Sequence, residues 1–105
     1  MHIQIINFQL SNLGEAEYRT LADEVAPTFA RVPGLLSKVW LANPETNTYG
    51  GVYTWADREA MEAYRRSELF GAIAANPRFA GVTSVDFAVL EDPTAVTRGL
   101  AAVAA

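Results

Sequence analysis

The sequence is defined first by the residues that it lacks. Its 105 residues include no cysteine, a single histidine (His2) and a single lysine (Lys38). Without cysteine the chain has no disulfide, no thiolate nucleophile and no cysteine-ligated zinc or iron–sulfur centre. One histidine at the second position excludes a histidine-rich metal cluster, so we expect no metal site.

Positive charge and long apolar runs are also scarce. The 8 Lys and Arg residues against 12 Asp and Glu residues give a formal net charge of -4, whereas a nucleic-acid-binding protein needs a basic surface to neutralise phosphates. No apolar run approaches the roughly 18 residues of a membrane span, and the opening MHIQIINFQL lacks the features of a signal peptide. We therefore expect no nucleic-acid partner, no membrane association and a cytoplasmic location.

Hydrophobic residues, in contrast, make up 50% of the chain, and charged residues make up 19%. This composition excludes disordered and collagen-like classes. The length predicts one domain over residues 1–105, and a domain this small buries only part of its surface by itself. The surplus of apolar residues therefore suggests that something beyond the monomer covers part of the surface.

Apolar residues that alternate along the chain predict the strands. The four segments with this pattern are 2–10, 35–42, 49–56 and 81–91. Helical spacing predicts a helix from about residue 15, with a kink or a second short helix starting at Pro27. A second helix follows Asp57 and stops at Asn76, with a break near Gly71, and the tail 92–105 is weakly helical.

The predicted order βαββαβ is typical of an α+β, ferredoxin-like fold with an antiparallel four-stranded sheet and two helices on one face. Strands 2–10, 35–42 and 81–91 carry large apolar residues on both faces, although two helices cover only one. A second copy of the chain is the simplest cover for the other face, so we predict a homodimer.

No motif with a mechanism of its own is present in the sequence. Gly50 and Gly51 lack the further glycines and the lysine of a phosphate-binding loop. We interpret this pair as a close approach of two backbones or a bulge in a strand.

Three residues are candidates for chemistry, and each has a structural alternative. Asn7 lies among apolar neighbours, where its amide either bonds nearby backbone or holds a substrate oxygen. Trp55 ends a predicted strand and is either a core residue or the wall of a pocket with its indole N–H directed inward. Asp86 either lies at an edge or dimer surface, or is buried and serves as a general base.

Lys38 and Trp40 share one face of the second predicted strand, and both are candidates for substrate contacts. Lys38 either holds its ammonium in solvent or serves as a cationic anchor for a ligand.

The stretch PTFARVPGLLSKVWLANPETNTYGGVYTWADREAMEAY resembles the YdhR-like mono-oxygenases of the dimeric α+β barrel superfamily. The most specific pieces are Pro33-Gly34, Lys38-Val39-Trp40, Gly50-Gly51-Val52-Tyr53 and Trp55-Ala56-Asp57. The resemblance extends from the first predicted strand to about Glu91. It implies a homodimer whose two sheets face each other, with a cavity between sheet and helices in each subunit.

The superfamily includes haem-degrading enzymes and cofactor-independent quinone-forming mono-oxygenases. The haem-degrading branch uses an Asn on the first strand, a Trp at the end of the third and a helix His. Asn7 and Trp55 match the first two, but the corresponding helix, SELFGAIA, has no histidine. The axial ligand for haem iron is therefore missing, which disfavours haem as a cofactor.

The resemblance thus implies a cofactor-independent mono-oxygenase that acts on a phenolic, quinol or anthrone-like substrate and dioxygen. The substrate would stack on Trp55, Tyr53 or Phe87 and be held by Asn7, with Asp86 or the substrate itself as the base. The alternative is a non-catalytic ligand-binding or stress-response dimer of the same fold, favoured by the lack of an acid–base group beside Asn7. A third hypothesis, an interaction protein that uses only its dimer surface, predicts a cavity filled by side chains.

Overall fold

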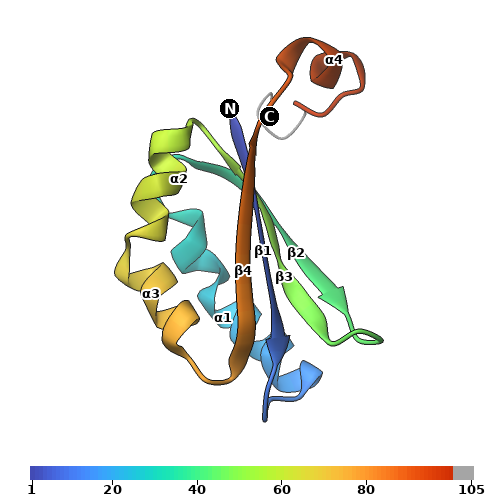
Figure 1. Cartoon of the computed structure of the whole chain (residues 1–105), viewed down its shortest axis with the longest axis vertical. Helices are drawn as coiled ribbons and strands as arrows, with labels where there is room; N and C mark the ends of the chain where they lie inside the picture. Colours follow the sequence, from blue (N-terminus) through green and yellow to red (C-terminus); the bar gives the residue numbers. More distant parts are fainter. Residues whose placement is uncertain (101–105) are drawn as a thin grey trace.

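The computed structural model describes residues 1–100 and shows four antiparallel strands with helices packed along one side (Figure 1). The strands are β1 (His2–Leu10), β2 (Leu35–Asn43), β3 (Thr48–Trp55) and β4 (Phe79–Ala88), in the spatial order β2-β3-β1-β4. The helices are α1 (Glu15–Ala30), α2 (Arg58–Arg65), α3 (Glu68–Ala75) and α4 (Glu91–Val96). The prediction of an α+β, ferredoxin-like fold is confirmed.

Of the two alternatives predicted at Pro27, a kink or a second short helix, the structure excludes the second helix. Helix α1 continues through Pro27 to Ala30, so no second helix starts there; a proline in the last turn removes one hydrogen bond and leaves the earlier turns intact. The second helical region is interrupted at Ser67 and not at Gly71. The Ser67 side chain accepts the backbone N–H of Phe70 and caps a new helix.

The last predicted strand is shifted toward the amino terminus. β4 covers Phe79–Ala88, whereas Leu90 precedes the short helix α4. Acidic residues Glu91 and Asp92 lie in the first turn of α4, where they interact favourably with the helix dipole. The weakly helical tail is thus seen over 91–96, and its last residues, 101–105, lie outside the described residues.

The sheet has two distinct faces. Helices α1, α2 and α3 cover one, which we call the inner face, and the other is left uncovered and is called the open face (Figure 1). The buried apolar core lies on the inner face and is mostly aromatic. Its residues are Ile6, Phe8, Tyr18, Phe29, Tyr49, Tyr53, Trp55, Met61 and Tyr64.

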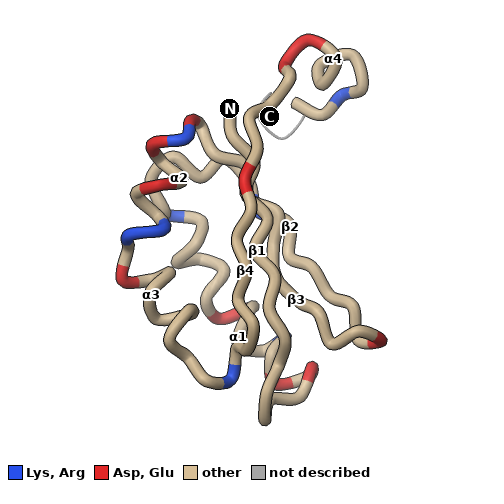
Figure 2. The backbone as a smooth tube through the Cα atoms, viewed as in Figure 1, with Lys and Arg blue, Asp and Glu red and all other residues tan. Residues whose placement is uncertain are grey.

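Within the strands, the Lys, Arg, Asp and Glu side chains are limited to Lys38 and Asp86 (Figure 2). Lys38 pairs with Tyr53 and Asp86 pairs with Gln4, and residues paired directly across strands share a face. Both charges therefore lie on the inner face. Among the described residues, none of these charged side chains lies on a strand position of the open face.

The open face presents exposed aliphatic and aromatic side chains, together with the uncharged polar residues Asn7, Thr54 and Thr83. Val39, Val85 and Phe87 are 58%, 49% and 55% exposed. An antiparallel sheet face that meets water usually carries polar residues.

No helix among residues 1–100 is long and apolar enough to cross a lipid bilayer.

Candidate functional site

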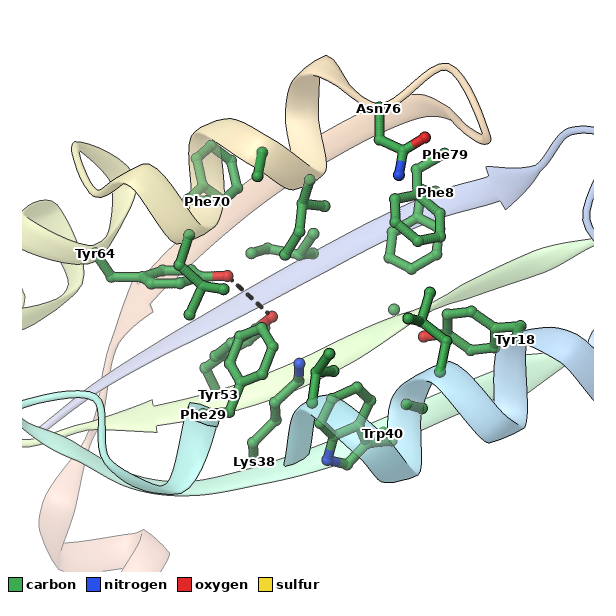
Figure 3. Close-up of a pocket in the computed structure, with 18 residues that line it drawn as sticks. Phe8, Tyr18, Phe29, Lys38, Trp40, Tyr53, Tyr64, Phe70, Asn76 and Phe79 are labelled. Carbon is green, nitrogen blue, oxygen red and sulfur yellow. Dashed lines mark hydrogen bonds between the residues drawn. The ribbon is translucent and has the colours of Figure 1, made fainter. Parts of the chain in front are cut away.

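A cavity of about 220 Å³ lies between the inner face and helices α1, α2 and α3 (Figure 3). Aliphatic and aromatic side chains form most of its wall. The polar side chains that reach it are Tyr18, Lys38, Tyr53, Tyr64 and Asn76. The interior is therefore mainly apolar with a few placed polar groups, which is the usual character of a small-molecule site.

Three aromatic side chains from three elements meet at one end of this cavity. Phe29 comes from the last turn of α1, Tyr53 from β3 and Tyr64 from α2, with ring centroids 5.5 Å apart for Tyr53–Tyr64 and 6.2 Å for Phe29–Tyr53. The two tyrosine hydroxyl oxygens are 3.4 Å apart and share a hydrogen bond. Burial raises the pKa of both tyrosines above the ordinary value of 10.0, so both stay neutral.

Lys38 extends from β2 into this aromatic cluster (Figure 3). Its Nζ lies 3.5 Å from the ring centroid of Phe29, 3.4 Å from that of Trp40 and 4.6 Å from that of Tyr53. Burial lowers the pKa of Lys38 from 10.5 to about 7. The ring faces act in the opposite direction because they attract an ammonium group.

Glycines on β3 make this arrangement possible. A Cβ at Gly51 would lie 2.8 Å from Cε of Lys38, so the missing side chain leaves room for the lysine stem. A Cβ at Gly50 would lie 1.8 Å from the carbonyl oxygen of Ile6 on β1. The interpretation as a close backbone approach is confirmed for Gly50, whereas Gly51 makes room mainly for a side chain.

Tyr18 and Asn76 line another part of the cavity. The Tyr18 ring packs against Phe8 and Tyr49 with centroid separations of 5.8 and 5.2 Å, and burial raises its pKa to about 12. Asn76 follows α3, and its Oδ1 accepts the backbone N–H of Arg78 at 3.0 Å. Its amide nitrogen points toward Phe8 (Figure 3).

A chain of polar contacts lies on the inner face outside the cavity lining. The indole Nε1 of Trp55 donates to Oε1 of Gln4 at 3.0 Å, and Nε2 of Gln4 donates to Oγ of Ser84 at 3.0 Å. His2 Nε2 and Asp86 Oδ2 are 2.6 Å apart, and this hydrogen bond holds the pKa of Asp86 below its ordinary value. These partners satisfy polar groups that would be costly to bury alone.

The structure brings together only part of the predicted site. Lys38, Trp40 and Tyr53 line the cavity, as predicted for ligand contacts. Trp55 is fully buried behind Tyr53, with ring centroids 5.9 Å apart, and its indole N–H is bonded to Gln4 instead of pointing inward.

The other predicted residues lie away from the cavity. Asn7 pairs with Gly50 and Thr83, and Phe87 pairs with Ile3, so strand alternation places Asn7 and Phe87 on the open face. Asp86 does lie on the inner face, but at the end of the sheet beside His2. The structure therefore does not bring Asn7, Asp86 and Phe87 together in this cavity.

Sequence reasoning missed Tyr18, Tyr64 and Asn76. The two tyrosines belong to apolar helical stripes, so their spacing could not separate a cavity wall from a core position. Asn76 was interpreted only as the end of a helix. The Asn76-Pro77 pair indicates the end of a helix, but it does not indicate in which direction the Asn76 amide points.

Comparison with protein-family models shows which family the chain belongs to. A family model described as "Putative mono-oxygenase ydhR" matches residues 3–100. The chain belongs to the ydhR mono-oxygenase family. The predicted resemblance is confirmed, although the sequence matches no curated protein.

Several solved structures share the fold of this chain. MhuD, a haem-degrader from Mycobacterium tuberculosis with two haems in its active site, is 23% identical with a TM-score of 0.69, covering 88% of this chain and 98% of its own. SnoaB, a cofactor-independent oxygenase from Streptomyces nogalater, is 20% identical with a TM-score of 0.64, covering 86% and 94%.

A third neighbour is a Deinococcus radiodurans protein described as a "putative antibiotic biosynthesis monooxygenase". It is 17% identical with a TM-score of 0.70, covering 87% of this chain and 94% of its own. At these identities the three neighbours show a shared fold. They therefore assign no activity to this chain.

The cavity lining lacks the usual axial ligands of haem iron. No His, Cys or Met is among the cavity-lining residues, and the lining tyrosines are held neutral by their raised pKa values. Within residues 1–100, no three His, Cys, Asp or Glu side chains form a group that could hold a metal ion.

Proposed function

We propose that the protein is a cofactor-independent mono-oxygenase that oxidises a small phenolic, quinol or anthrone-like compound with dioxygen. The substrate binds in the cavity between the inner face and the helices. The observation that carries this proposal is the aromatic cavity with one amine in its wall, in a chain of a mono-oxygenase family.

The shape and lining of the cavity support a small aromatic ligand. Its volume of about 220 Å³ is below the roughly 300–1,000 Å³ of sites for drug-sized ligands. Flat faces of Phe29 and Tyr53 offer stacking partners, while Lys38 and Asn76 offer polar contacts to ring substituents. We assign substrate contacts to Lys38, Trp40 and Tyr53, and to Trp55 a supporting role behind Tyr53.

In this reaction the substrate supplies the electrons. For an anthrone-like compound, one atom of dioxygen enters the product as a new carbonyl oxygen. The other atom leaves as water with the hydrogens of the oxidised CH₂ group. The protein binds and orients the reactants, and its apolar cavity limits the access of water to reactive intermediates.

The donor set of the cavity supports the proposal that the reaction needs no cofactor. Haem degradation would need an axial ligand, and neither imidazole nor thiolate lines the cavity. The neighbour SnoaB is itself a cofactor-independent oxygenase, which shows that the fold accommodates this kind of activity.

We further propose that the protein is a homodimer in which two open faces pack together. The face has no Lys, Arg, Asp or Glu at the strand positions described, and it exposes Val39, Val85 and Phe87. When such a face packs against a copy of itself, apolar area is removed from water and no charged side chain is buried without a partner. Asn7 would then lie at this interface and contribute a polar contact there.

An oxygen-uptake experiment tests the enzymatic proposal. The purified protein is supplied with a panel of anthrones and hydroquinones, and labelled dioxygen is followed into the product by mass spectrometry. We expect oxygen consumption above the buffer rate and one labelled oxygen atom in each product molecule.

Two matched variants on α1 connect this activity to the cavity. Ala22→Leu places a larger side chain in the cavity wall and is expected to lower turnover by about tenfold or more. Ala16→Leu makes the same change at an exposed position of α1 and should leave turnover unchanged. Equal turnover in both variants would contradict the assignment of this cavity.

A second candidate function is a ligand carrier that performs no oxidation. It is favoured by the fact that no carboxylate or imidazole lines the cavity. Native mass spectrometry separates the two functions. A ligand that is retained unaltered, without oxygen uptake by any member of the panel, supports the carrier and rules out the mono-oxygenase.

A further inference from the structure

We propose that Lys38 accepts the proton of the bound ligand, so that the cavity selects aromatic compounds with an ionisable hydroxyl group. The proposal rests on the proposed function for the place where substrate binds, and it deepens that function by naming the base and the substrate class. The base was the component that sequence reasoning left open between Asp86 and the substrate.

The first argument is the position of the amine. Lys38 crosses the space left by Gly51 and ends over the rings of Phe29, Trp40 and Tyr53, within 4.6 Å of each centroid. Nζ therefore stands in the cavity wall and faces any ligand that stacks there. Asp86, the other charged strand residue, is engaged with His2 at the end of the sheet.

The second argument is the absence of a competing charge. Of the groups that face Lys38 from the elements packed around the cavity, the titratable ones are Tyr18 of α1, Tyr53 of β3 and Tyr64 of α2. The residues that α3 and β1 contribute to the lining carry no charge. In the part of the chain described, no carboxylate forms an ion pair with Lys38.

The third argument is the choice of proton acceptor. Near neutral pH a substantial fraction of Lys38 carries a free lone pair, because burial brings its pKa to about 7. The tyrosines cannot replace it, since their pKa values are raised and Tyr53 and Tyr64 bond each other. Lys38 is the only group among the cavity-lining residues that can take up a proton near pH 7.

The proton transfer is balanced within the cavity. A neutral hydroxyl group of the ligand gives its proton to the neutral amine, and the electron pair of the O–H bond stays on oxygen. The products are an oxyanion and an ammonium side by side, so the cavity gains no net charge. The surrounding ring faces stabilise the ammonium, and the oxyanion becomes a better electron donor to dioxygen than the neutral compound.

This inference is tested by binding and does not need turnover. The probe is 4-nitrophenol, whose ionised form absorbs at longer wavelength than its neutral form, and 4-nitroanisole is the matched ether without a proton to lose. At a pH below the pKa of free 4-nitrophenol, we expect the wild-type protein to bind the phenol in its ionised form. We expect binding about tenfold tighter than for the ether.

Variants show whether Lys38 causes the ionisation. Lys38→Met keeps a flexible side chain of similar length without an amine, and it should bind both probes equally and leave the phenol neutral. Arg66→Met removes an exposed cation from the helical layer and should behave as wild type. Gly51→Ala, which displaces the lysine stem, should weaken binding of the phenol more than binding of the ether.

Three results would overturn the proposal: no binding of either probe, equal binding of both by the wild-type protein, or an ionised phenol in Lys38→Met. The outcome is separate from that of the oxygen-uptake experiment. Ionisation of 4-nitrophenol without any oxygen uptake by the substrate panel would refute the mono-oxygenase and leave the role of Lys38 standing.

Discussion

The two faces of the sheet are apolar in different ways. The inner face contains the aromatic core, both charged strand residues and a chain of hydrogen bonds from Trp55 through Gln4 to Ser84. The open face has aliphatic and aromatic side chains without charged partners, and Val39 and Phe87 are more than half exposed. The inner face is therefore organised within one chain, whereas the open face leaves apolar side chains exposed in the single chain.

This difference shows how to separate a site from an interface when both are hydrophobic. A site needs placed polar groups inside an apolar wall, and Lys38 provides one together with Asn76. An obligate interface resembles half of a protein core and needs shape and area more than placed charges. Changes on the inner face should therefore affect folding or chemistry, and changes on the open face should affect association.

The largest expected effect comes from the centre of the inner face. Trp55→Ala removes a fully buried side chain and the hydrogen-bond donor for Gln4. We expect the free energy of unfolding to fall by about 4 kcal/mol, from the lost packing and the unpaired amide oxygen. Chemical denaturation monitored by circular dichroism measures this loss, and a decrease below about 1 kcal/mol would contradict the central packing role of Trp55.

The next effect tests the open face. Val85→Asp places a carboxylate in the proposed interface, where its desolvation should raise the dissociation constant of the dimer by about 100-fold. Each folded monomer should keep its secondary structure because Val85 is already half exposed. Analytical ultracentrifugation over a concentration series measures the change.

The matched control carries the same charge on the other side of the molecule. Ala63→Asp lies at an exposed position of α2 in the helical layer. It should leave association unchanged. Equal dissociation in both variants, or a wild-type protein that is monomeric at every concentration, would show that the open face does not bind a second copy.

The smallest effect is a change in how stability depends on pH. The folded protein holds the pKa of Lys38 at about 7, below its ordinary value of 10.5. Between these values the unfolded chain binds more protons than the folded one, so stability rises with pH across this window. Below the window, the folded protein bears the full penalty, which is the free-energy cost of burying a charged Lys38. Lys38→Met removes the penalty and should raise the free energy of unfolding by about 2 kcal/mol at low pH.

The control for this prediction is the same variant at a pH above 10.5. Lys38 is then neutral in both the folded and the unfolded wild-type chain, so its burial no longer costs charge desolvation. The stability difference between wild type and Lys38→Met should shrink there. A difference that does not change with pH would mean that Lys38 is not buried as the structure places it.

Much of the fold could be predicted from the sequence because it depends on periodic patterns. Alternating apolar residues located all four strands, and their order indicated the sheet. The break between α2 and α3 was misplaced because the capping hydroxyl of Ser67 is a weaker signal than the glycine at position 71. The end of β4 was misplaced because Leu90 continues the apolar pattern beyond the last paired residue.

The site was harder to predict because it depends on which face each residue occupies and what it touches there. Lys38, Trp40 and Tyr53 line the cavity because they share the inner face of adjacent strands. Strand alternation groups Asn7 with Ile3 and Ile5 on the open face, whereas the family resemblance favoured Asn7 as a site residue. Tyr64 and Asn76 reach the cavity only through the packing of helices, which no spacing along the chain encodes.

The most direct test of the account is a titration of Lys38 itself. Because the chain has a single lysine, labelling with ¹³Cε-lysine gives one signal whose chemical shift reports the charge of this amine by nuclear magnetic resonance. The account predicts a midpoint of about pH 7 in the free protein and a shift to higher pH when 4-nitrophenol is bound. A midpoint at the ordinary value of 10.5, unchanged by the phenol, would contradict it.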